Sequence, residues 1–247
     1  IVGTGGDAHG TFNISTATAL VVAGTGVPVA KHGNRAFSSL SGAADVLAAL
    51  GVDLEAKKKL VEKSIVEAKI GFLMAPIYHS AMRHVGPTRA EIGIRTIFNI
   101  LGPMCNPASV KYLLVGTYDP KWLVPMAETL SGLGVRRAWI VHGNDGMDEL
   151  TTTGTSEIAQ LADGNISTLE IGPGDAGLPL TDIDKLKGGS PEENAKAIRD
   201  LLKGAKGPYR DIVLLNSSAA LVVAEKAANL KEGVDEIRKT YDGLDSL

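Results

Sequence analysis

Short apolar runs rich in β-branched residues alternate with helical patterns along most of the chain, and this alternation constrains the fold more than any other feature. Strands separated by helices are joined by crossovers, so they pair in parallel and helices cover both faces of the sheet. We therefore expect an α/β fold with a mainly parallel sheet flanked by helices. The predicted strands are residues 27–30, 111–117, 137–142 and 156–161, and Ile1 and Val2 are expected to end a further strand.

Helical periodicity and capping residues place the predicted helices between and after these strands. Asn13 or Ser15 is expected to cap a helix at 16–23, and Ser41 a helix that ends at Gly51. The other predicted helices are residues 54–69, 122–133, 191–202 and 217–230.

The segment from Pro76 to Pro103 has helical spacing, three arginines and bounding prolines, and we expect it to be an excursion from the sheet domain. The predicted organisation is one α/β domain made of residues 1–75 and 104–247, with a helical excursion at 76–103. The length agrees with this organisation, because 247 residues suffice for one large domain or for a domain with a small appendage.

Composition excludes several classes of protein. The 44% of hydrophobic and 21% of charged residues are typical of a soluble globular chain, and no apolar run approaches the roughly 20 residues of a membrane span. The formal net charge of -3 provides no basic excess for non-specific binding to nucleic acid. Cys105 is the single cysteine, which excludes an intramolecular disulfide and a cysteine-cluster metal site and suits a reducing cytoplasm.

Glycine is abundant, with 29 residues in 247, and the first candidate site is built from it. Gly3-Thr4-Gly5-Gly6-Asp7 precedes Asn13-Ile14-Ser15-Thr16 at a helix start. Closely spaced glycines let backbone N–H groups approach an anion, and a helix N-terminus adds donors and partial positive charge. A tight strand-to-helix connection would use the same glycines. Asp7 favours a sugar phosphate or a diphosphate with Mg²⁺ over free phosphate.

The second candidate site is Lys31-His32-Gly33-Asn34-Arg35, directly after the strand at 27–30, with Ser38, Ser39 and Ser41 before the next helix. Ligands bind outside the carboxyl ends of strands in open parallel sheets. Two cations, an amide and several hydroxyls in that place suit a phosphorylated ligand, although a solvated basic turn has the same composition.

The third candidate site is Asp145-Gly146-Met147-Asp148-Glu149, after the strand that ends near His142. Adjacent carboxylates on a loop can bind one or two Mg²⁺ ions. Alone, the motif would be interpreted as an acidic surface turn. Three loops at strand ends, each suited to anions or to Mg²⁺, favour a binding site.

Other polar residues carry weaker signals. An arginine near a cleft can bind a carboxylate, whereas on a helix face it is usually solvated, and the spacing of Arg83, Arg89 and Arg95 does not separate these cases. His84 and His142 are expected to be structural. Cys105 lies among turn prolines without a base partner, so it is not expected to be a nucleophile.

Five motifs occur in order along the chain: GTGGD, NIST, KHGNR, RTIFNILGP followed by NP, and HGNDGMDE. Together they resemble the anthranilate phosphoribosyltransferase family of tryptophan biosynthesis, over nearly the whole chain. The resemblance implies the fold of the C-terminal domain of nucleoside phosphorylases and phosphoribosyltransferases. It also implies a glycosyltransferase that moves the phosphoribosyl group of phosphoribosyl pyrophosphate (PRPP) to the amine of anthranilate and releases pyrophosphate, with Mg²⁺, expected as two ions per site.

The resemblance further assigns residues to the substrates and the metal, and implies no protein nucleophile. For PRPP it implies Gly3, Thr4, Gly5, Gly6, Asp7, Asn13, Ser15, Thr16, Lys31, Ser38, Ser39 and Ser41. For anthranilate it implies Gly3, His32, Asn34, His79 and Arg89, and for Mg²⁺ it implies Ser15, Asp148 and Glu149.

The chain departs from the family mainly at its start, where most of a small N-terminal helical domain is expected to be missing. We expect the excursion at 76–103 to pack on that domain, and the intact protein to be a cytoplasmic homodimer. The expected partners are small-molecule substrates, with neither nucleic acid nor membrane. Two alternatives are a pyrimidine nucleoside phosphorylase-like enzyme, which cleaves nucleosides with inorganic phosphate, and a non-catalytic anion-binding module of the same fold.

Overall fold

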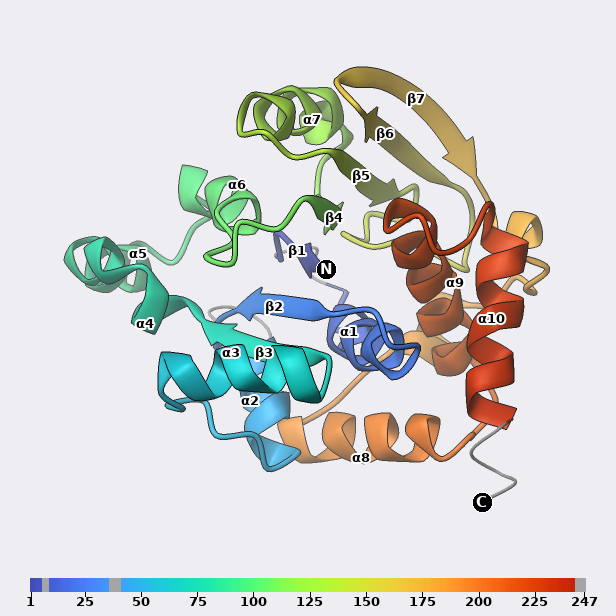
Figure 1. Ribbon diagram of the computed structural model, residues 1–247, viewed down its shortest axis with the longest axis horizontal. Helices are drawn as coiled ribbons and strands as arrows, with labels where there is room; N and C mark the ends of the chain where they lie inside the picture. The colour runs from blue at the N-terminus through green and yellow to red at the C-terminus, as the bar shows by residue number, and fades with distance from the viewer. Residues whose placement is uncertain (6–8, 36–40, 243–247) are drawn as a thin grey trace.

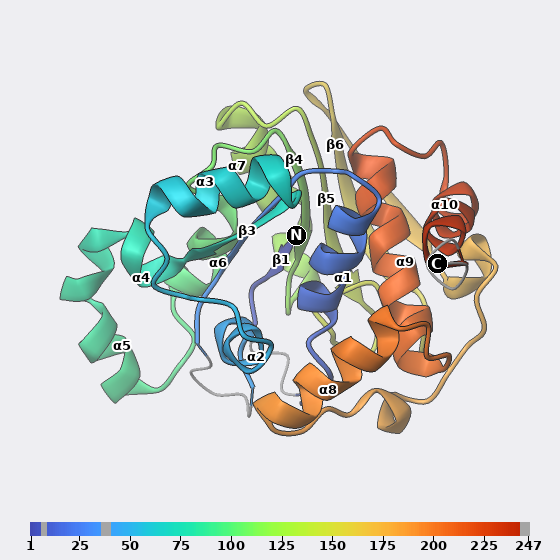
Figure 2. The ribbon, with the colours of Figure 1, turned by 60° about the horizontal axis from the view of Figure 1, so that its bottom comes forward.

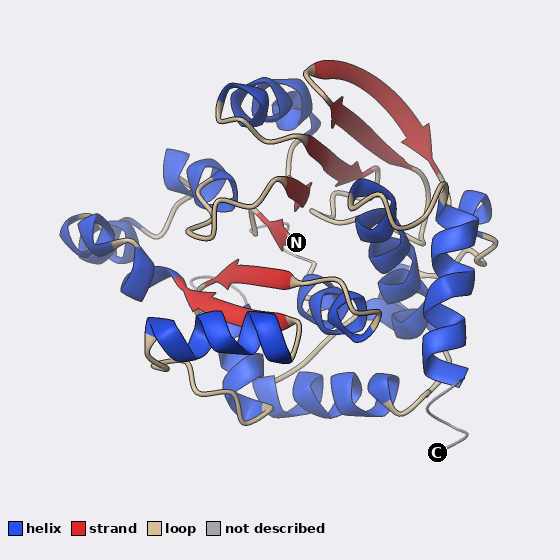
Figure 3. Cartoon of the chain, viewed as in Figure 1, coloured by secondary structure: helices blue, strands red, loops and turns tan. Residues whose placement is uncertain are grey.

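The computed structural model describes residues 1–5, 9–35 and 41–242, which form two sheets surrounded by helices (Figures 1 and 3). The strands are β1 (Val2–Gly3), β2 (Val29–Gly33), β3 (Ile70–Met74), β4 (Tyr112–Gly116), β5 (Arg137–Gly143), β6 (Ser156–Ala162) and β7 (Asn165–Ile171). The α-helices are α1 (Ile14–Gly24), α2 (Ala43–Ala49), α3 (Lys58–Glu67), α4 (Ala75–Tyr78), α5 (Gly86–Ile92), α6 (Ile97–Met104), α7 (Leu123–Gly132), α8 (Pro191–Leu202), α9 (Pro208–Val223) and α10 (Leu230–Asp242). Short 3₁₀ helices occupy η1 (Ser80–His84), η2 (Pro120–Trp122), η3 (Pro173–Ala176) and η4 (Ile183–Leu186).

The larger sheet has the strand order β1-β4-β5-β6-β7. Strands β1, β4 and β5 are parallel, whereas β6 and β7 pair antiparallel at the opposite edge. Strands β2 and β3 form a separate parallel pair. The prediction of an α/β fold with a mainly parallel sheet is therefore confirmed, and the antiparallel edge is an addition that the sequence analysis did not anticipate.

Alternating side chains of the sheet divide the apolar core into two layers. In β4, Leu113 and Val115 pack in a cluster with α6, α7 and the matching faces of β5 and β6. Leu114 points to the other face, where the larger cluster contains α1, α9 and α10. Figure 1 shows α7 and α9 on opposite sides of β5 and β6. Period-two burial of this kind is what a sheet covered on both faces requires.

The small sheet has its own cover, and it lies beside the strand that starts the chain. Helix α3 packs on β3 and helix α1 contacts both β2 and β3 (Figure 2). Helix α2 packs on α8. Helix α8 begins at Ser190, whose hydroxyl accepts the N–H of Glu193 at 3.2 Å while the Glu193 carboxylate accepts the N–H of Ser190 at 2.8 Å. This reciprocal cap and Pro191 in the first turn explain the predicted start of that helix.

Several predicted elements have different bounds or were missed. The predicted helix at 54–69 is shorter, because Lys69 adopts a φ of 63° and the chain turns into β3, which was not predicted. Strand β7 was missed as well, because most of its residues are not buried. The predicted helix at 217–230 is helical at 217–223, but its bounds are wrong: α9 starts earlier, after Gly207, and the chain turns at Glu225, with a φ of 58°, before α10.

The predicted caps of two helices also differ from the structure. Gly42, not Ser41, is the N-cap of α2, and the Asp45 carboxylate accepts its N–H at 3.1 Å. Asn13 occupies the N-cap position of α1, but its side chain makes no capping hydrogen bond.

Residues 75–104 form α4, η1, α5 and α6; α5 extends away from both sheets on the left of Figure 1, whereas Ile100 and Met104 of α6 pack in the core cluster of β4 and α7. Three isoleucines here are largely exposed: Ile92 at 52%, Ile94 at 68% and Ile97 at 55%. Cys105 is exposed at the end of α6. In the described residues, no helix is both long and apolar enough to span a membrane.

Helix α10 packs closely on α9 at Gly233, and this contact gives a test of the fold. Alanine normally stabilises a helix interior relative to glycine by about 1 kcal/mol. A Cβ at Gly233, however, would lie 2.8 Å from the Ser218 Cβ and 3.0 Å from its Cα, atoms that cannot rotate away. We expect Gly233→Ala to lower the free energy of unfolding by roughly 1–3 kcal/mol, measured by urea denaturation.

Gly132→Ala is the matched control, because a Cβ at Gly132 in α7 would meet nothing within 4 Å. That variant should be neutral or slightly stabilising. Equal stabilisation by both substitutions would contradict the close packing of α10 on α9.

Candidate functional site

The first and third predicted loops meet at the carboxyl ends of the parallel strands. Gly3 of β1 pairs with Gly116 of β4, and Gly116 pairs with Val141 of β5. Beyond these ends, the backbone N–H of Gly5 donates to Asp148 Oδ2 at 2.7 Å, across 143 residues of sequence. The loop after β1 and the loop after β5 therefore form one site, as expected for loops at the same edge of a parallel sheet.

Two glycines permit this close approach. A Cβ at Gly116 would overlap the backbone carbonyl of Asp148, and a Cβ at Gly3 would overlap its carboxylate. The Gly3 and Gly116 positions thus have no space for a side chain. This packing explains part of the glycine content, and Gly116 was not identified from the sequence.

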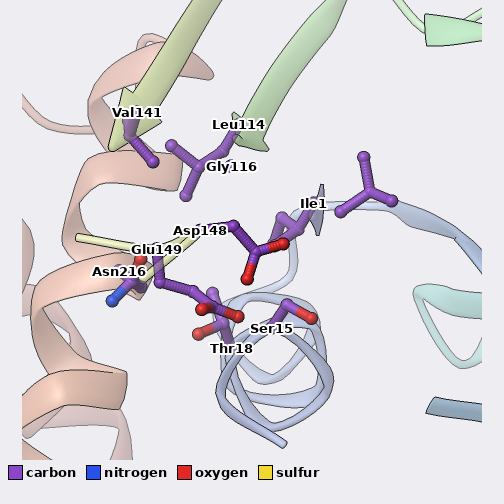
Figure 4. A pocket seen from close by; sticks show the side chains of 10 residues that line it. Ile1, Ser15, Thr18, Leu114, Gly116, Val141, Asp148, Glu149 and Asn216 are labelled. Atoms are coloured by element: carbon purple, nitrogen blue, oxygen red, sulfur yellow. The ribbon is translucent and has the colours of Figure 1, made fainter. Parts of the chain in front are cut away.

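The acidic loop after β5 divides its carboxylates between two roles. Asp145 faces its own loop, where it accepts hydrogen bonds from the hydroxyls of Thr151 and Thr153 and, at 3.1 Å, from the N–H of Met147. Asp148 and Glu149 instead point toward helix α1 (Figure 4). Asp145 therefore shapes the loop, and the two following acids face the cavity.

The cavity between the two loops is lined by residues from six parts of the fold (Figure 4). Its lining residues are Ile1, Val2, Ser15, Thr18, Leu114, Gly116, Val141, Asp148, Glu149 and Asn216. Ser15 and Thr18 come from α1, and Asn216 comes from α9. The polar side of the cavity therefore combines two carboxylates, two hydroxyls and a carboxamide.

Helix α1 presents its N-terminus to this region with its cap residue turned away. The Asn13 carboxamide donates to the carbonyl of Ser41 at 3.1 Å, accepts from the Ser41 hydroxyl at 3.3 Å, and accepts from Asn194 Nδ2 at 2.8 Å. An N-cap side chain usually binds the N–H groups of the second or third helical residue, here Ser15 and Thr16. These first-turn donors, which no helix satisfies internally, are not bound by the Asn13 side chain.

Lys31 is buried within β2 rather than exposed on a loop, because β2 continues through Gly33. Only 2% of its surface is exposed, and Nζ donates to the Ser15 hydroxyl at 3.3 Å and to the carbonyl of Ile1 at 3.5 Å. Burial lowers the pKa of Lys31 to about 8, although the nearby carboxylates of Glu149 and Asp148 oppose that shift. A cation and two carboxylates therefore share one buried region, which reduces the free-energy cost of burying each charge.

His32 and His79 form a second polar group, from β2 and from the residue after α4. Their Nε2 atoms lie 3.1 Å apart, so one ring donates a hydrogen bond to the other. Burial and the neighbouring His79 lower the pKa of His32 to about 4, while a backbone hydrogen bond with Gly102 opposes the shift. The His32 imidazole is therefore neutral at pH 7.

The other residues that were predicted to bind the substrates lie in different parts of the structure. Thr4 accepts the N–H of Tyr118 with its hydroxyl at 3.1 Å, and Thr16 buries its hydroxyl with no hydrogen-bond partner among the described residues. The Asn34 carboxamide oxygen accepts the N–H of Arg35 at 2.9 Å. Arg89 lies in α5, and its side chain is outside the described part of the structure. Gly6, Asp7, Ser38 and Ser39 also lie outside the described residues.

His142, predicted to be structural, is buried in β5, with Nδ1 2.8 Å from the carbonyl oxygen of Thr117. Asn216 was missed by the sequence analysis, although a lone carboxamide after the apolar run 212–215 was a usable signal. It is 2% exposed and bonds to both backbone groups of Leu150.

The donor set indicates which metal would fit. No cluster of three or more His, Cys, Asp or Glu side chains that could hold a metal occurs within the described ranges. Two adjacent carboxylates and the Ser15 hydroxyl provide only oxygen ligands. Mg²⁺ commonly binds through one or two carboxylates, with substrate phosphates and waters completing its shell, so this set suits Mg²⁺.

The chain is similar to known enzymes over almost its full length. Residues 1–243 match the sequence model of the glycosyl transferase family, a/b domain. Anthranilate phosphoribosyltransferase of Parvibaculum lavamentivorans is 60% identical over 242 residues, which cover 98% of this chain and 71% of the relative. The Brucella canis enzyme of the same name is 58% identical with the same coverage.

Solved structures give the same result. The crystal structure of anthranilate phosphoribosyltransferase from Thermus thermophilus superposes with a TM-score of 0.91 and 49% identity, covering 97% of this chain and 71% of that one. The Saccharomyces cerevisiae enzyme in complex with PRPP and Mg has a TM-score of 0.88 and 31% identity, covering 98% of this chain and 68% of that one.

The lowered pKa of His32 predicts a pH-dependent stability. Because the unfolded chain has the higher pKa of about 6.5, it binds the proton more readily between pH 6.5 and 4. The contribution of neutral His32 is complete above pH 6.5 and is lost as the pH falls toward 4, by roughly 2–3 kcal/mol in total.

We expect His32→Gln to lose less stability than the wild type between pH 8 and pH 4.5, as measured by urea denaturation at both pH values. The other acidic groups are common to both proteins and cancel in the comparison. Parallel losses in the two proteins would show that His32 is not held neutral.

Proposed function

Because the chain belongs to the anthranilate phosphoribosyltransferase family, we propose that it transfers the 5-phosphoribosyl group of PRPP to the amine of anthranilate. The products are N-(5-phosphoribosyl)anthranilate and pyrophosphate. The observation that best supports this proposal is the hydrogen bond from Gly5 to Asp148, because it brings a glycine-rich anion loop and an acidic loop to one site. A diphosphate donor with its metal requires that combination.

The donor would lie between the loop after β1 and the N-terminus of α1. The N–H groups of Ser15 and Thr16 and the helix dipole favour a phosphate there. Lys31 would supply positive charge. Gly3, Thr4 and Gly5 would line the donor, while the N–H groups of Thr4 and Gly5 are held by the Gly116 carbonyl and the Asp148 carboxylate. The other proposed PRPP residues, from the sequence resemblance, are Gly6, Asp7, Asn13, Ser38, Ser39 and Ser41.

Asp148, Glu149 and Ser15 would hold Mg²⁺, and we propose two ions because the two carboxylates are adjacent and each can serve its own ion. Bound Mg²⁺ would neutralise negative charge on the diphosphate. The hydrogen bond from Gly5 would orient the Asp148 carboxylate among these ligands.

The acceptor would lie on the side of His32 and His79, with Gly3, Asn34 and Arg89 as the other proposed anthranilate residues. A neutral His32 suits an amine nucleophile, because it places no cation beside the attacking nitrogen. Arg89 would bind the anthranilate carboxylate, as arginine does elsewhere.

In the proposed reaction, the bond between C1 of the ribose and the pyrophosphate oxygen breaks, and a bond from C1 to the anthranilate nitrogen forms. The nitrogen releases one proton to water, and the pyrophosphate leaves with the bonding electron pair. No residue acts as a nucleophile, so the contribution of the protein is positioning and electrostatic stabilisation.

Removing both carboxylates tests the donor site. We expect Asp148→Ala together with Glu149→Ala to abolish Mg²⁺-dependent binding of PRPP, measured by titration calorimetry with and without Mg²⁺. A matched control is Asp235→Ala with Glu236→Ala, because these adjacent acids are exposed on α10 and the charge change is equal. Binding that survives the first pair of substitutions would contradict the proposal, and a turnover assay with anthranilate separates the transferase from a non-catalytic binding module.

We also propose that residues 76–103 pack against a helical domain that is additional to this chain. The relatives are longer, since the chain covers 71% of their length, and this segment exposes Ile92, Ile94 and Ile97. Pairing of two copies into a homodimer is part of the same proposal.

Replacing these three isoleucines by threonine should change the free energy of unfolding by no more than about 0.5 kcal/mol for each residue, as surface substitutions usually do. Sedimentation velocity should show less self-association than in the wild type. A large loss of stability would instead place these side chains in the core of the chain itself.

A further inference from the structure

We propose that Asn216 is a positioning residue for the acidic loop, one that fixes the Asp148 and Glu149 carboxylates relative to helix α1. This inference rests on the proposed function, because it concerns how the chain holds the donor and its metal. Asn216 lines the cavity from α9, beside the loop that carries the carboxylates (Figure 4), and it acts through that loop.

The contacts of Asn216 form a clamp on the backbone of one residue. Its Oδ1 accepts the N–H of Leu150 at 3.0 Å, and its Nδ2 donates to the carbonyl of Leu150 at 2.8 Å. Nδ2 also donates to the carbonyl of Ile212, one turn earlier in α9, at 2.9 Å. Both backbone groups of Leu150 are therefore bonded to a side chain that is itself tied to its own helix.

The clamp acts next to the carboxylates. Leu150 directly follows Glu149 and is fully buried. On the other side, the Asp148 carboxylate is bonded to Gly5. The loop is thus held at both ends of the Asp148-Glu149 pair, so that a shift of the pair requires breaking one of these hydrogen bonds.

Helix α9 connects this clamp to the rest of the proposed donor site. It packs along α1, the helix whose N-terminus is proposed to bind phosphate. A rigid helix that contacts α1 on one face and grips the acidic loop through Asn216 sets the separation between the phosphate-binding and metal-binding groups. A carboxamide is suited to this task, because it donates and accepts at once and carries no charge into the cavity.

The experiment compares the wild type with Asn216→Ala, Asn216→Asp and Ser218→Ala. Asn216→Asp keeps the shape and an acceptor for the N–H of Leu150 but, when ionised, has no donor for the two carbonyls. Ser218→Ala is the matched control, because Ser218 is buried in the same helix and donates to the carbonyl of Leu215 at 2.8 Å, within α9 itself.

The first readout is hydrogen exchange in the protein without ligand. We expect residues 145–152 to exchange at least tenfold faster in Asn216→Ala and to a smaller extent in Asn216→Asp, with no change there in Ser218→Ala. The second readout is the Mg²⁺ concentration that half-saturates PRPP binding in titration calorimetry. It should rise at least fivefold in Asn216→Ala and stay within twofold in Ser218→Ala.

The inference would be overturned if Asn216→Ala exchanged at the wild-type rate in the loop and needed no more Mg²⁺ than the wild type. It would also be overturned if Ser218→Ala had effects equal to those of Asn216→Ala, because equal effects indicate general destabilisation. Failure of the wild type to bind PRPP with Mg²⁺ would overturn the proposed function instead. The exchange measurement needs no ligand, so it still tests whether Asn216 holds the acidic loop in that case.

Discussion

The site depends on one hydrogen bond, from the backbone N–H of Gly5 to the Asp148 carboxylate. It joins the loops after β1 and β5, and it forms only because β4 places a glycine between them. A side chain at Gly116 would push the backbone of Asp148 away from the strand ends. The cavity lies where these two loops approach each other, and Ser15 and Thr18 of α1 also line it.

The charges around the cavity are arranged so that no single one is buried without compensation. Lys31 loses hydration in β2, and its pKa falls to about 8, yet two carboxylates and the Ser15 hydroxyl lie nearby. Near pH 7 the lysine therefore remains mostly charged. The histidine pair avoids a buried charge altogether, because burial lowers the pKa of His32 and the ring is held neutral.

The motif positions could be predicted from sequence because strand ends and helix starts have local signals. Gly3 and Asp148 lie where a parallel sheet directs its ligand-binding loops, whereas Lys31 lies inside β2. Local sequence signals failed where a contact between residues distant in sequence determines the local structure. Ser41 was expected to cap α2, but it binds Asn13 instead, and Asn13 in turn is held by Asn194, 181 residues later. The predicted helix at 217–230 had the wrong bounds, because α9 is buried at nearly every position from Ile212 to Val223 and shows little helical periodicity.

The class of fold and the family could be identified from the sequence alone, and the candidate residues proposed from it, because each of these is carried by local patterns and motifs. Which of those residues share one cavity, and in which protonation state, depends on the tertiary packing. That packing separates Asp145, which shapes its own loop, from Asp148 and Glu149, which face α1. It also gives Asn216 and Gly116 their roles, through contacts with residues distant in sequence. Burial, desolvation and steric exclusion are properties of the assembled chain, and no short segment contains them.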